Sequence, residues 1–149
     1  MPQYQTTFAV DWSPTQTFRY MANFSNSAEW DPGVARAEQL TEDPLAVGAR
    51  FAVVAKFLGR KVKLTYETVA LDPPRRVLFR AESGTVVSLD EMTFEPTAVG
   101  GTVLTYVADL QLKGAMRIVS PVMSFAFRRI GDRARNGISE RLAQAPSGR

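Results

Sequence analysis

The sequence contains no cysteine and no histidine among its 149 residues. Without cysteine the chain forms no disulfide and offers no thiol nucleophile or thiolate metal ligand. Histidine is the commonest general base and metal ligand near neutral pH, so any catalysis must rest on Asp, Glu, Tyr, Lys, Arg or a bound cofactor. These absences argue against most metal sites and lower the expectation of an enzyme, and we predict neither a metal nor a cofactor.

Long apolar runs are also missing. No segment approaches the roughly 18 apolar residues of a membrane span. The amino terminus, MPQYQTTFAV, has neither the basic region nor the continuous apolar region of a secretory signal. We therefore expect a cytoplasmic protein. The net charge of +3 is mild and would favour an anionic partner only if the positive charges gathered on one face.

What is present is the composition of an ordinary globular domain, with 45% hydrophobic and 10% aromatic residues. A chain of this length can bury one substantial core but not two independent ones. We expect one domain over residues 1–149, with residues 144–149 forming a flexible tail.

Alternating apolar residues separated by turn residues predict seven strands. The expected ranges are Gln3 to Val10, Val34 to Leu40, Arg50 to Phe57, Lys61 to Leu71, Arg76 to Glu82, Val86 to Pro96 and Thr102 to Leu112. The turns between the last six predict successive antiparallel neighbours. A sheet of this size needs a cover for its apolar face.

Two short helices and one long helix are predicted to provide that cover. Ser13-Pro14, with Gln16 three residues after the serine, is a capping box that starts a helix ending near Asn23. A second brief helix is expected over residues 25–30. Ser120-Pro121 starts a long helix to residue 143, because apolar residues then recur every three or four positions.

Gly131 and Gly137 lie inside this long helix, where each costs about 1 kcal/mol relative to alanine. Either the helix bends there or another part of the chain approaches its backbone closely. Gly137 borders the apolar stripe and could leave space beneath the helix. Simple tolerance of both glycines is the alternative.

Several motifs in this order resemble the START/Bet v 1-like (SRPBCC) superfamily, in particular its bacterial polyketide cyclase/dehydrase and lipid-transport branch, over essentially the whole chain. They are Ser13-Pro14, Asn23-Phe24-Ser25-Asn26, Trp30-Asp31-Pro32-Gly33-Val34, Val47-Gly48-Ala49-Arg50-Phe51, Tyr66, Asp72-Pro73-Pro74-Arg75-Arg76, Phe94-Glu95-Pro96 and Gly100-Gly101-Thr102. Each motif is mostly turn chemistry, and the order and spacing carry the resemblance.

The resemblance implies an α+β helix-grip fold. A curved antiparallel sheet of about seven strands, in the chain order β-α-α-β6-α, would wrap around the long carboxy-terminal helix. It further implies a large apolar cavity between the sheet and that helix, with a mouth near the two short helices. The superfamily includes lipid and sterol carriers, quinone-binding proteins, aromatic cyclases and ribosome-associated toxins, so the fold does not determine the function.

Alternation along the strands and the helical stripe predict the cavity wall, to which Trp30 is added at the rim. The candidate ligand contacts are Trp30, Phe51, Val53, Leu64, Tyr66, Phe79, Met92, Phe94, Tyr106, Met123, Phe127 and Ile130. Each could equally be an ordinary core residue, because protein interiors are close-packed. At the rim, Trp30 would keep its indole N–H near water, and a purely structural role for it is slightly favoured.

Three polar side chains share the inward face with this wall. The hydroxyls of Tyr66 and Tyr106 need partners if they are buried. Asp90 has the parity of the inward residues of its strand, and burial would raise its pKa and could make it a proton acceptor near neutrality. They are the candidate catalytic residues, although Asp90 could instead stay wet at the strand end.

Three functions remain open. The favoured one is a carrier or sensor that binds a lipid, isoprenoid, quinone or polyketide-like molecule. The second is a polyketide cyclase or dehydratase that works without histidine or metal, mainly by positioning its substrate. The third is a ribosome- or protein-interaction module that uses the arginines of the last helix. Nucleic-acid binding is not expected, because no aromatic residues interleave these arginines.

Overall fold

The computed structural model describes residues 3–57, 59–84, 86–113 and 121–144, without the side chains of residues 57 and 121–127. Its strands are β1 (Gln3–Val10), β2 (Val34–Gln39), β3 (Arg50–Phe57), β4 (Arg60–Asp72), β5 (Arg76–Glu82), β6 (Val86–Pro96) and β7 (Thr102–Leu112). Its helices are α1 (Pro14–Ala22), the 3-10 turn η1 (Phe24–Asn26), α2 (Ser27–Trp30) and α3 (Pro121–Arg141). The predicted helix-grip architecture is confirmed.

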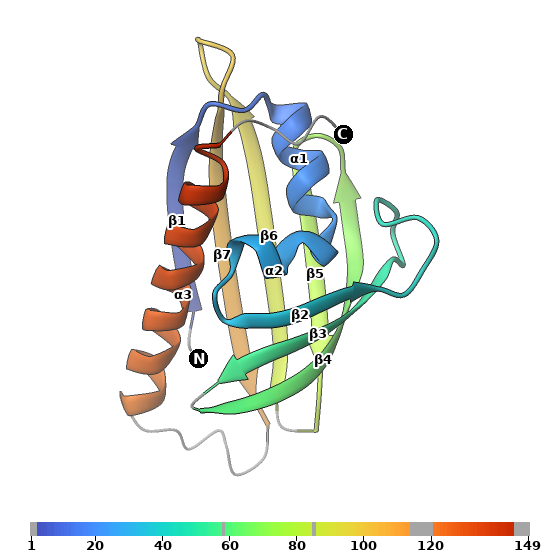
Figure 1. Ribbon diagram of the computed structural model, residues 1–149, viewed down its shortest axis with the longest axis vertical. Coiled ribbons are helices and arrows are strands. Elements are labelled where there is room, and N and C mark those ends of the chain that lie inside the picture. Colours follow the sequence, from blue (N-terminus) through green and yellow to red (C-terminus); the bar gives the residue numbers. More distant parts are fainter. Residues whose placement is uncertain (1–2, 58, 85, 114–120, 145–149) are drawn as a thin grey trace.

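All seven strands form one antiparallel sheet in the order β1-β7-β6-β5-β4-β3-β2. Strands β2 to β7 pair in chain order, whereas β1 crosses to pair with β7 at the far edge. Figure 1 shows the sheet curving, with α3 alongside β1 and the short helices α1 and α2 lying over its middle. One face of the sheet therefore encloses an interior that the helices cover.

The first helix starts where the capping box predicts. The Ser13 hydroxyl accepts a hydrogen bond from the Gln16 amide at 3.2 Å, and the Gln16 side-chain oxygen accepts one from the Ser13 amide at 3.1 Å. These two bonds satisfy backbone donors that have no partner within the helix. The chain then turns through η1 into α2, so the second predicted helix is divided into two short pieces.

The two glycines of α3 are contact points with other parts of the fold. A Cβ at Gly137 would lie 1.7 Å from the carbonyl oxygen of Trp30. A Cβ at Gly131 would lie 2.4 Å from the ring of Tyr4. The expectation of space beneath Gly137 is therefore wrong, because the end of α2 fills it. The close approach of Tyr4 and of the Trp30 backbone accounts for both glycines.

The carboxy-terminal end of α3 is fixed to the first two helices by a polar and aromatic cluster. The Tyr20 hydroxyl donates to the Glu29 carboxylate at 2.6 Å, and Arg141 pairs with the same carboxylate at 3.5 Å. The Arg141 guanidinium also lies over the rings of Tyr20 and Trp12, at 4.9 and 5.5 Å. These contacts hold α3, α1 and α2 together at one end of the interior.

Among the described residues, no helix is long and apolar enough to cross a membrane. The predicted tail, residues 144–149, lies outside the described residues except for Gln144.

Candidate ligand-binding site

A pocket with a volume of about 230 Å³ lies between the sheet and the middle of α3. Its apolar wall is formed by Phe24, Val34, Val53, Ala55, Val62, Leu64, Val86, Ala108, Leu110, Leu112, Ile130 and Ala134, together with the backbone of Gly33 and Gly131. Its polar lining is formed by Asp31, Lys56, Tyr66, Ser88, Asp90 and Tyr106. Such a cavity, mostly apolar with a few polar groups, is typical of a small-molecule site.

Four of the polar residues form a connected group, here called the polar cluster: Tyr66, Ser88, Asp90 and Tyr106. The Tyr106 hydroxyl donates to Asp90 Oδ2 at 2.6 Å, and the Ser88 hydroxyl donates to Asp90 Oδ1 at 3.0 Å. The Tyr66 hydroxyl donates to the Ser88 oxygen over a longer 3.5 Å. Strands β6 and β7 thus place two hydroxyls on one carboxyl group, and β4, which is separated from β6 by β5, adds a third hydroxyl through Ser88.

Burial dominates the electrostatics of this cluster. It raises the pKa of Asp90, and the hydrogen bonds from Tyr106 and Ser88 oppose that rise only in part. Burial, followed by repulsion from the Asp90 charge, raises the pKa of Tyr106 well above its ordinary value. The pKa of Tyr66 rises for the same two reasons. Both tyrosines therefore remain protonated donors, while Asp90 keeps its proton to a higher pH than an exposed aspartate does.

A second carboxyl group, Asp31, contributes to the pocket from the turn between α2 and β2. Its Oδ1 accepts a hydrogen bond from the Gly33 amide at 2.8 Å, which holds the side chain against its own turn. The pKa of Asp31 is raised to about 6. Burial is the main cause of this rise and the nearby Asp90 charge adds to it, while the hydrogen bond from Gly33 acts in the opposite direction. The pocket therefore contains two coupled carboxyl groups.

Among the described residues, a second part of the interior is filled by a group here called the aromatic core: Phe18, Trp30, Phe51, Phe79 and Phe94. The Phe18 and Phe94 rings pack edge to face with their centroids 5.6 Å apart. Those of Phe51 and Phe79 do the same with their centroids 6.4 Å apart. Each of these side chains is at most 2% exposed. Edge-to-face aromatic packing of this kind leaves no room for a ligand there.

Phe24 of η1 separates the aromatic core from the pocket. The centroid of its ring lies 4.5 Å from that of Phe79, 4.7 Å from that of Tyr66 and 6.2 Å from that of Trp30. It lines the pocket as well. Phe24 therefore lies at the boundary between packed and hollow interior, as does Tyr106, which packs on Trp30 and also lines the pocket.

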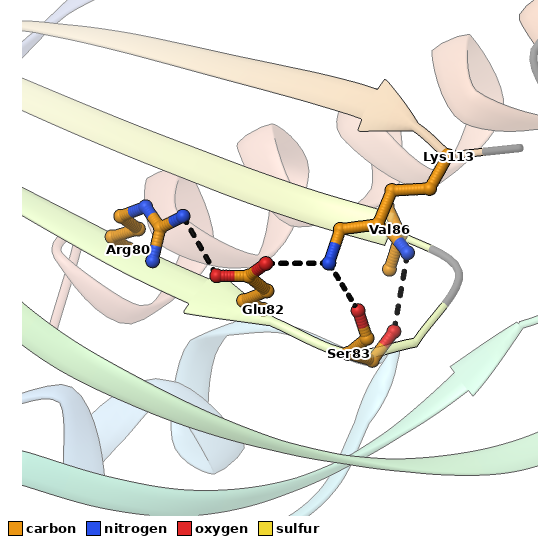
Figure 2. A network of polar contacts seen from close by, with 5 residues as sticks. All are labelled: Arg80, Glu82, Ser83, Val86 and Lys113. Atoms are coloured by element: carbon orange, nitrogen blue, oxygen red, sulfur yellow. Dashed lines mark hydrogen bonds and ion pairs between the residues drawn. The ribbon is translucent and has the colours of Figure 1, made fainter.

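Ionic contacts secure the strand ends beside the pocket (Figure 2). Glu82, at the end of β5, accepts hydrogen bonds from Arg80 and from Lys113, which follows β7. Lys113 also donates to the Ser83 carbonyl at 2.8 Å, and the Ser83 hydroxyl accepts from the Val86 amide at 3.2 Å. Lys113, followed by Arg80, lowers the pKa of Glu82. These contacts join the ends of β5, β6 and β7.

A family model described as polyketide cyclase / dehydrase and lipid transport matches residues 1–143. The chain belongs to this family. Its membership in the START/Bet v 1-like superfamily, predicted from the ordered motifs, is thereby confirmed. A comparison with curated protein sequences finds no match.

Solved structures agree with the family assignment. A protein from Thermus thermophilus has a TM-score of 0.78 at 16% identity, over 95% of this chain and 97% of that chain. The Zhui aromatase/cyclase from Streptomyces sp. R1128 has a TM-score of 0.76 at 17% identity, over 99% and 98%. A START superfamily protein from Mycobacterium smegmatis has a TM-score of 0.78 at 10% identity, over 94% and 96%. Identities this low show the fold of the family alone.

Only part of the wall predicted from strand alternation and the helical stripe lines the pocket. Val53, Leu64, Tyr66, Tyr106 and Ile130 lie there, as does the predicted polar residue Asp90. Trp30, Phe51, Phe79, Met92 and Phe94 are instead buried in packed interior outside the pocket lining. The side chains of Met123 and Phe127 lie outside the described residues.

The expected rim position of Trp30 is wrong. Its side chain is only 1% exposed, and among the described residues its indole Nε1 has no hydrogen-bond partner. Its ring packs edge to face on Phe24 and Tyr106, at 6.2 Å from each. The close contact of the Trp30 backbone with Gly137 of α3 explains this burial, because α3 lies directly over the end of α2.

Sequence reasoning missed Asp31 and Ser88. Ser88 has the same parity as Asp90 along β6, so alternation could have identified it. Asp31 lies in a turn, where no periodicity indicates which way a side chain points. The Asp31 side chain reaches the pocket because of the path that the chain takes from α2 to β2, and this path is set by the tertiary structure.

Proposed function

We propose that this protein binds a hydrophobic small molecule in the pocket between the sheet and α3, as a carrier or sensor. The observation that carries the proposal is an apolar cavity with a single polar region, the polar cluster and Asp31. Such a site gains affinity by burying the apolar body of a ligand and orients it through a few hydrogen bonds. Family membership supports the same function.

The volume of the pocket favours a small ligand. At about 230 Å³ it is below the roughly 300–1,000 Å³ of most drug-sized sites. A single alkyl chain of moderate length or a compact aromatic molecule with one polar end suits this space. Among the described residues, no group of three or more carboxylate side chains is placed to hold a metal ion, so the proposal involves no metal.

Native mass spectrometry can test this function on protein purified under gentle conditions. Wild-type protein should carry or take up an apolar molecule from a panel of short alcohols, isoprenoids and quinones. Ala108→Leu, which adds three carbon atoms to the pocket wall, should lose most of that binding. The matched control is Val103→Leu, a substitution on the same strand at a position that does not line the pocket. Absence of binding to wild-type protein across the panel would contradict the proposal.

A second candidate is acid–base catalysis, as in a cyclase or dehydratase. The observation that favours it is the pair of carboxyl groups with raised pKa values, Asp31 and Asp90, beside the same cavity. In dehydration of a β-hydroxy ketone, one carboxylate would take the α-proton. The other carboxyl would protonate the departing hydroxyl, so that water leaves and a carbon–carbon double bond forms.

A β-hydroxy ketone with a naphthyl group is a suitable probe, because its enone product absorbs at longer wavelength. Catalysis predicts that Asp31→Asn and Asp90→Asn each slow dehydration about 100-fold or more, as removal of an acid or base usually does. Asp109→Asn, on the opposite side of β7, serves as the control. Wild-type protein that does not accelerate the reaction above buffer would leave binding as the function.

A further inference from the structure

Counting protons in the polar cluster indicates what its ligand must supply. An ionised carboxylate only accepts hydrogen bonds, and each hydroxyl has one proton to donate. The protons of Tyr106 and Ser88 are both directed at Asp90, and the proton of Tyr66 is directed at Ser88. Three protons serve three contacts, so the cluster has oxygen lone pairs to spare but only the loosely held Tyr66 proton to offer a ligand.

Asp31 increases this excess of acceptors. Its Oδ1 is engaged by the Gly33 amide, whereas Oδ2 has no hydrogen-bond partner among the described residues. Burial is the main reason that the pKa of Asp31 is raised, and repulsion from the Asp90 charge raises this pKa further. A ligand group that donates hydrogen bonds would use this spare acceptor capacity and reduce the repulsion.

Positive charge is scarce along this pocket. Among the described lining residues, Lys56 of β3 is the only cation, and its side chain is exposed. No arginine lines the pocket within the described part of the chain. A ligand carboxylate placed at the polar cluster would be desolvated beside two acidic groups without a buried counter-ion, which is strongly unfavourable.

A proton on Asp90 changes this balance by one donor. Four protons would then serve the same three contacts, which leaves one proton available to a ligand oxygen. A hydroxyl can both donate and accept, so it fits the cluster in either state. A carboxylate would still lie beside Asp31 and gain only one bond.

We propose that the pocket selects apolar molecules whose polar end donates hydrogen bonds, a hydroxyl or an amine, and excludes those that end in a carboxylate. This specificity rests on the proposed binding function and defines the ligand class of the same site. The competing arrangement is a fatty acid that enters tail first and leaves its carboxylate at Lys56 on the pocket edge.

Decanol, decylamine and decanoate test this selection, because they share one chain and differ only in the polar end. Their dissociation constants would be measured at neutral pH by displacement of the uncharged dye N-phenylnaphthylamine, below the concentration at which they form micelles. We expect decanol and decylamine to bind about tenfold or more tightly than decanoate, a difference of about 1.4 kcal/mol or more.

Three variants assign the discrimination to the carboxyl groups. Asp31→Asn retains an oxygen for the Gly33 amide, so the turn should keep its shape. This variant should reduce the preference for decylamine over decanoate, given by the ratio of their dissociation constants, about threefold or more. Asp90→Asn should narrow it further if that variant folds. Asp109→Asn, whose neighbours Ala108 and Leu110 line the pocket while it does not, should leave the ratio unchanged.

The possible results separate the two proposals. Equal binding of all three compounds would overturn the selection while leaving the binding function intact. If decanoate bound more tightly than the other two compounds, and Lys56→Met lost this binding, the tail-first arrangement would be established. The proposed selection against carboxylates would then be overturned. Failure of every compound, including the dye, to bind would refute the proposed function and the selection together.

Discussion

The interior between the sheet and α3 contains an aromatic core and a pocket, although the same strands contribute to both. Along β6, Ser88 and Asp90 line the pocket, whereas Met92 and Phe94 are fully packed. On the neighbouring strand β7 the pocket extends one inward-facing residue further, because Tyr106 lines the pocket although it pairs with the packed Met92, whereas Leu104 does not line it.

The difference between the two regions has two causes. Helix α1, the turn η1 and α2 cover the aromatic core and insert aromatic rings between sheet and helix, such as Phe18 against Phe94. Beyond α2, α3 presents only Ile130, Gly131 and Ala134 to the pocket among its described residues. The wall residues are also smaller there, for example Ala108. A uniform inward-facing pattern thus yields a filled region where rings enter and a hollow one where they do not.

The largest change to the filled region should follow from Trp30→Ala. Removal of a side chain that is only 1% exposed should lower the free energy of unfolding by about 4 kcal/mol, as large-to-small core substitutions of tryptophan do. The new cavity borders Phe24 and Tyr106 of the pocket, so affinity for N-phenylnaphthylamine should change as well.

Trp12→Ala is the matched control for this variant. Trp12 is 4% exposed, and its indole N–H donates to the Gln144 carbonyl at 2.7 Å, outside the pocket lining. Urea denaturation and dye titration of both variants would give the comparison. Equal changes in affinity, after correction for stability, would show that Trp30 affects structure alone.

Gly137→Ala should separate α3 from the filled region. Because a Cβ there would lie 1.7 Å from the Trp30 carbonyl oxygen, the helix or α2 must move. We expect a loss of about 3 kcal/mol in unfolding free energy, at the upper end for overpacking. Gly84→Ala is the control, since a Cβ there meets no atom within 4 Å. Similar denaturation midpoints for the two variants would contradict this close approach.

Asp31→Asn tests the polar side of the hollow region through pH. The folded-state pKa of about 6 lies above the ordinary value of 3.8, so between these values the folded state holds a proton that the unfolded state has released. The Asp31 contribution to stability is therefore full below about pH 4 and is lost as pH rises through about 6.

Relative to Asp31→Asn, wild-type protein should lose roughly 2 to 3 kcal/mol of unfolding free energy between about pH 4 and pH 7, because the pKa rise to about 6 amounts to about 1.4 kcal/mol per pKa unit. Denaturation of both proteins at several pH values would measure the difference. A difference that does not vary with pH would show that Asp31 titrates alike in both states.

The smallest effect on stability is expected when alanine is replaced by leucine, a substitution that can be made in both regions. Ala22 of α1 is 0% exposed and lies outside the pocket lining, so Ala22→Leu should cost about 2 kcal/mol by overpacking. Ala108→Leu should instead extend into the pocket and change stability by less than about 1 kcal/mol, while weakening dye binding about tenfold. Equal loss of stability in the two variants would mean that the wall at Ala108 has no space to fill.

Much of the fold was predictable because local rules act strongly on this sequence. The serine and proline at Ser13-Pro14 start α1 as expected, and alternation assigned Phe51, Phe79 and Phe94 to the inward face correctly. The candidate site was only partly predictable. Alternation identifies a face of a strand, but it does not indicate where along the strand packing ends, so Val53 and Phe51 received the same interpretation.

The sequence by itself determined the strands, the helices, the inward faces and the candidate polar residue Asp90, because periodicity and turn chemistry act over neighbouring residues. Only the tertiary structure decided that Trp30 is covered by α3, that Asp31 shares a pocket with Asp90, and that the interior is hollow along one part. These outcomes depend on contacts between segments far apart in the chain, such as Gly137 with Trp30. Such contacts follow from how side-chain volumes fit together in three dimensions.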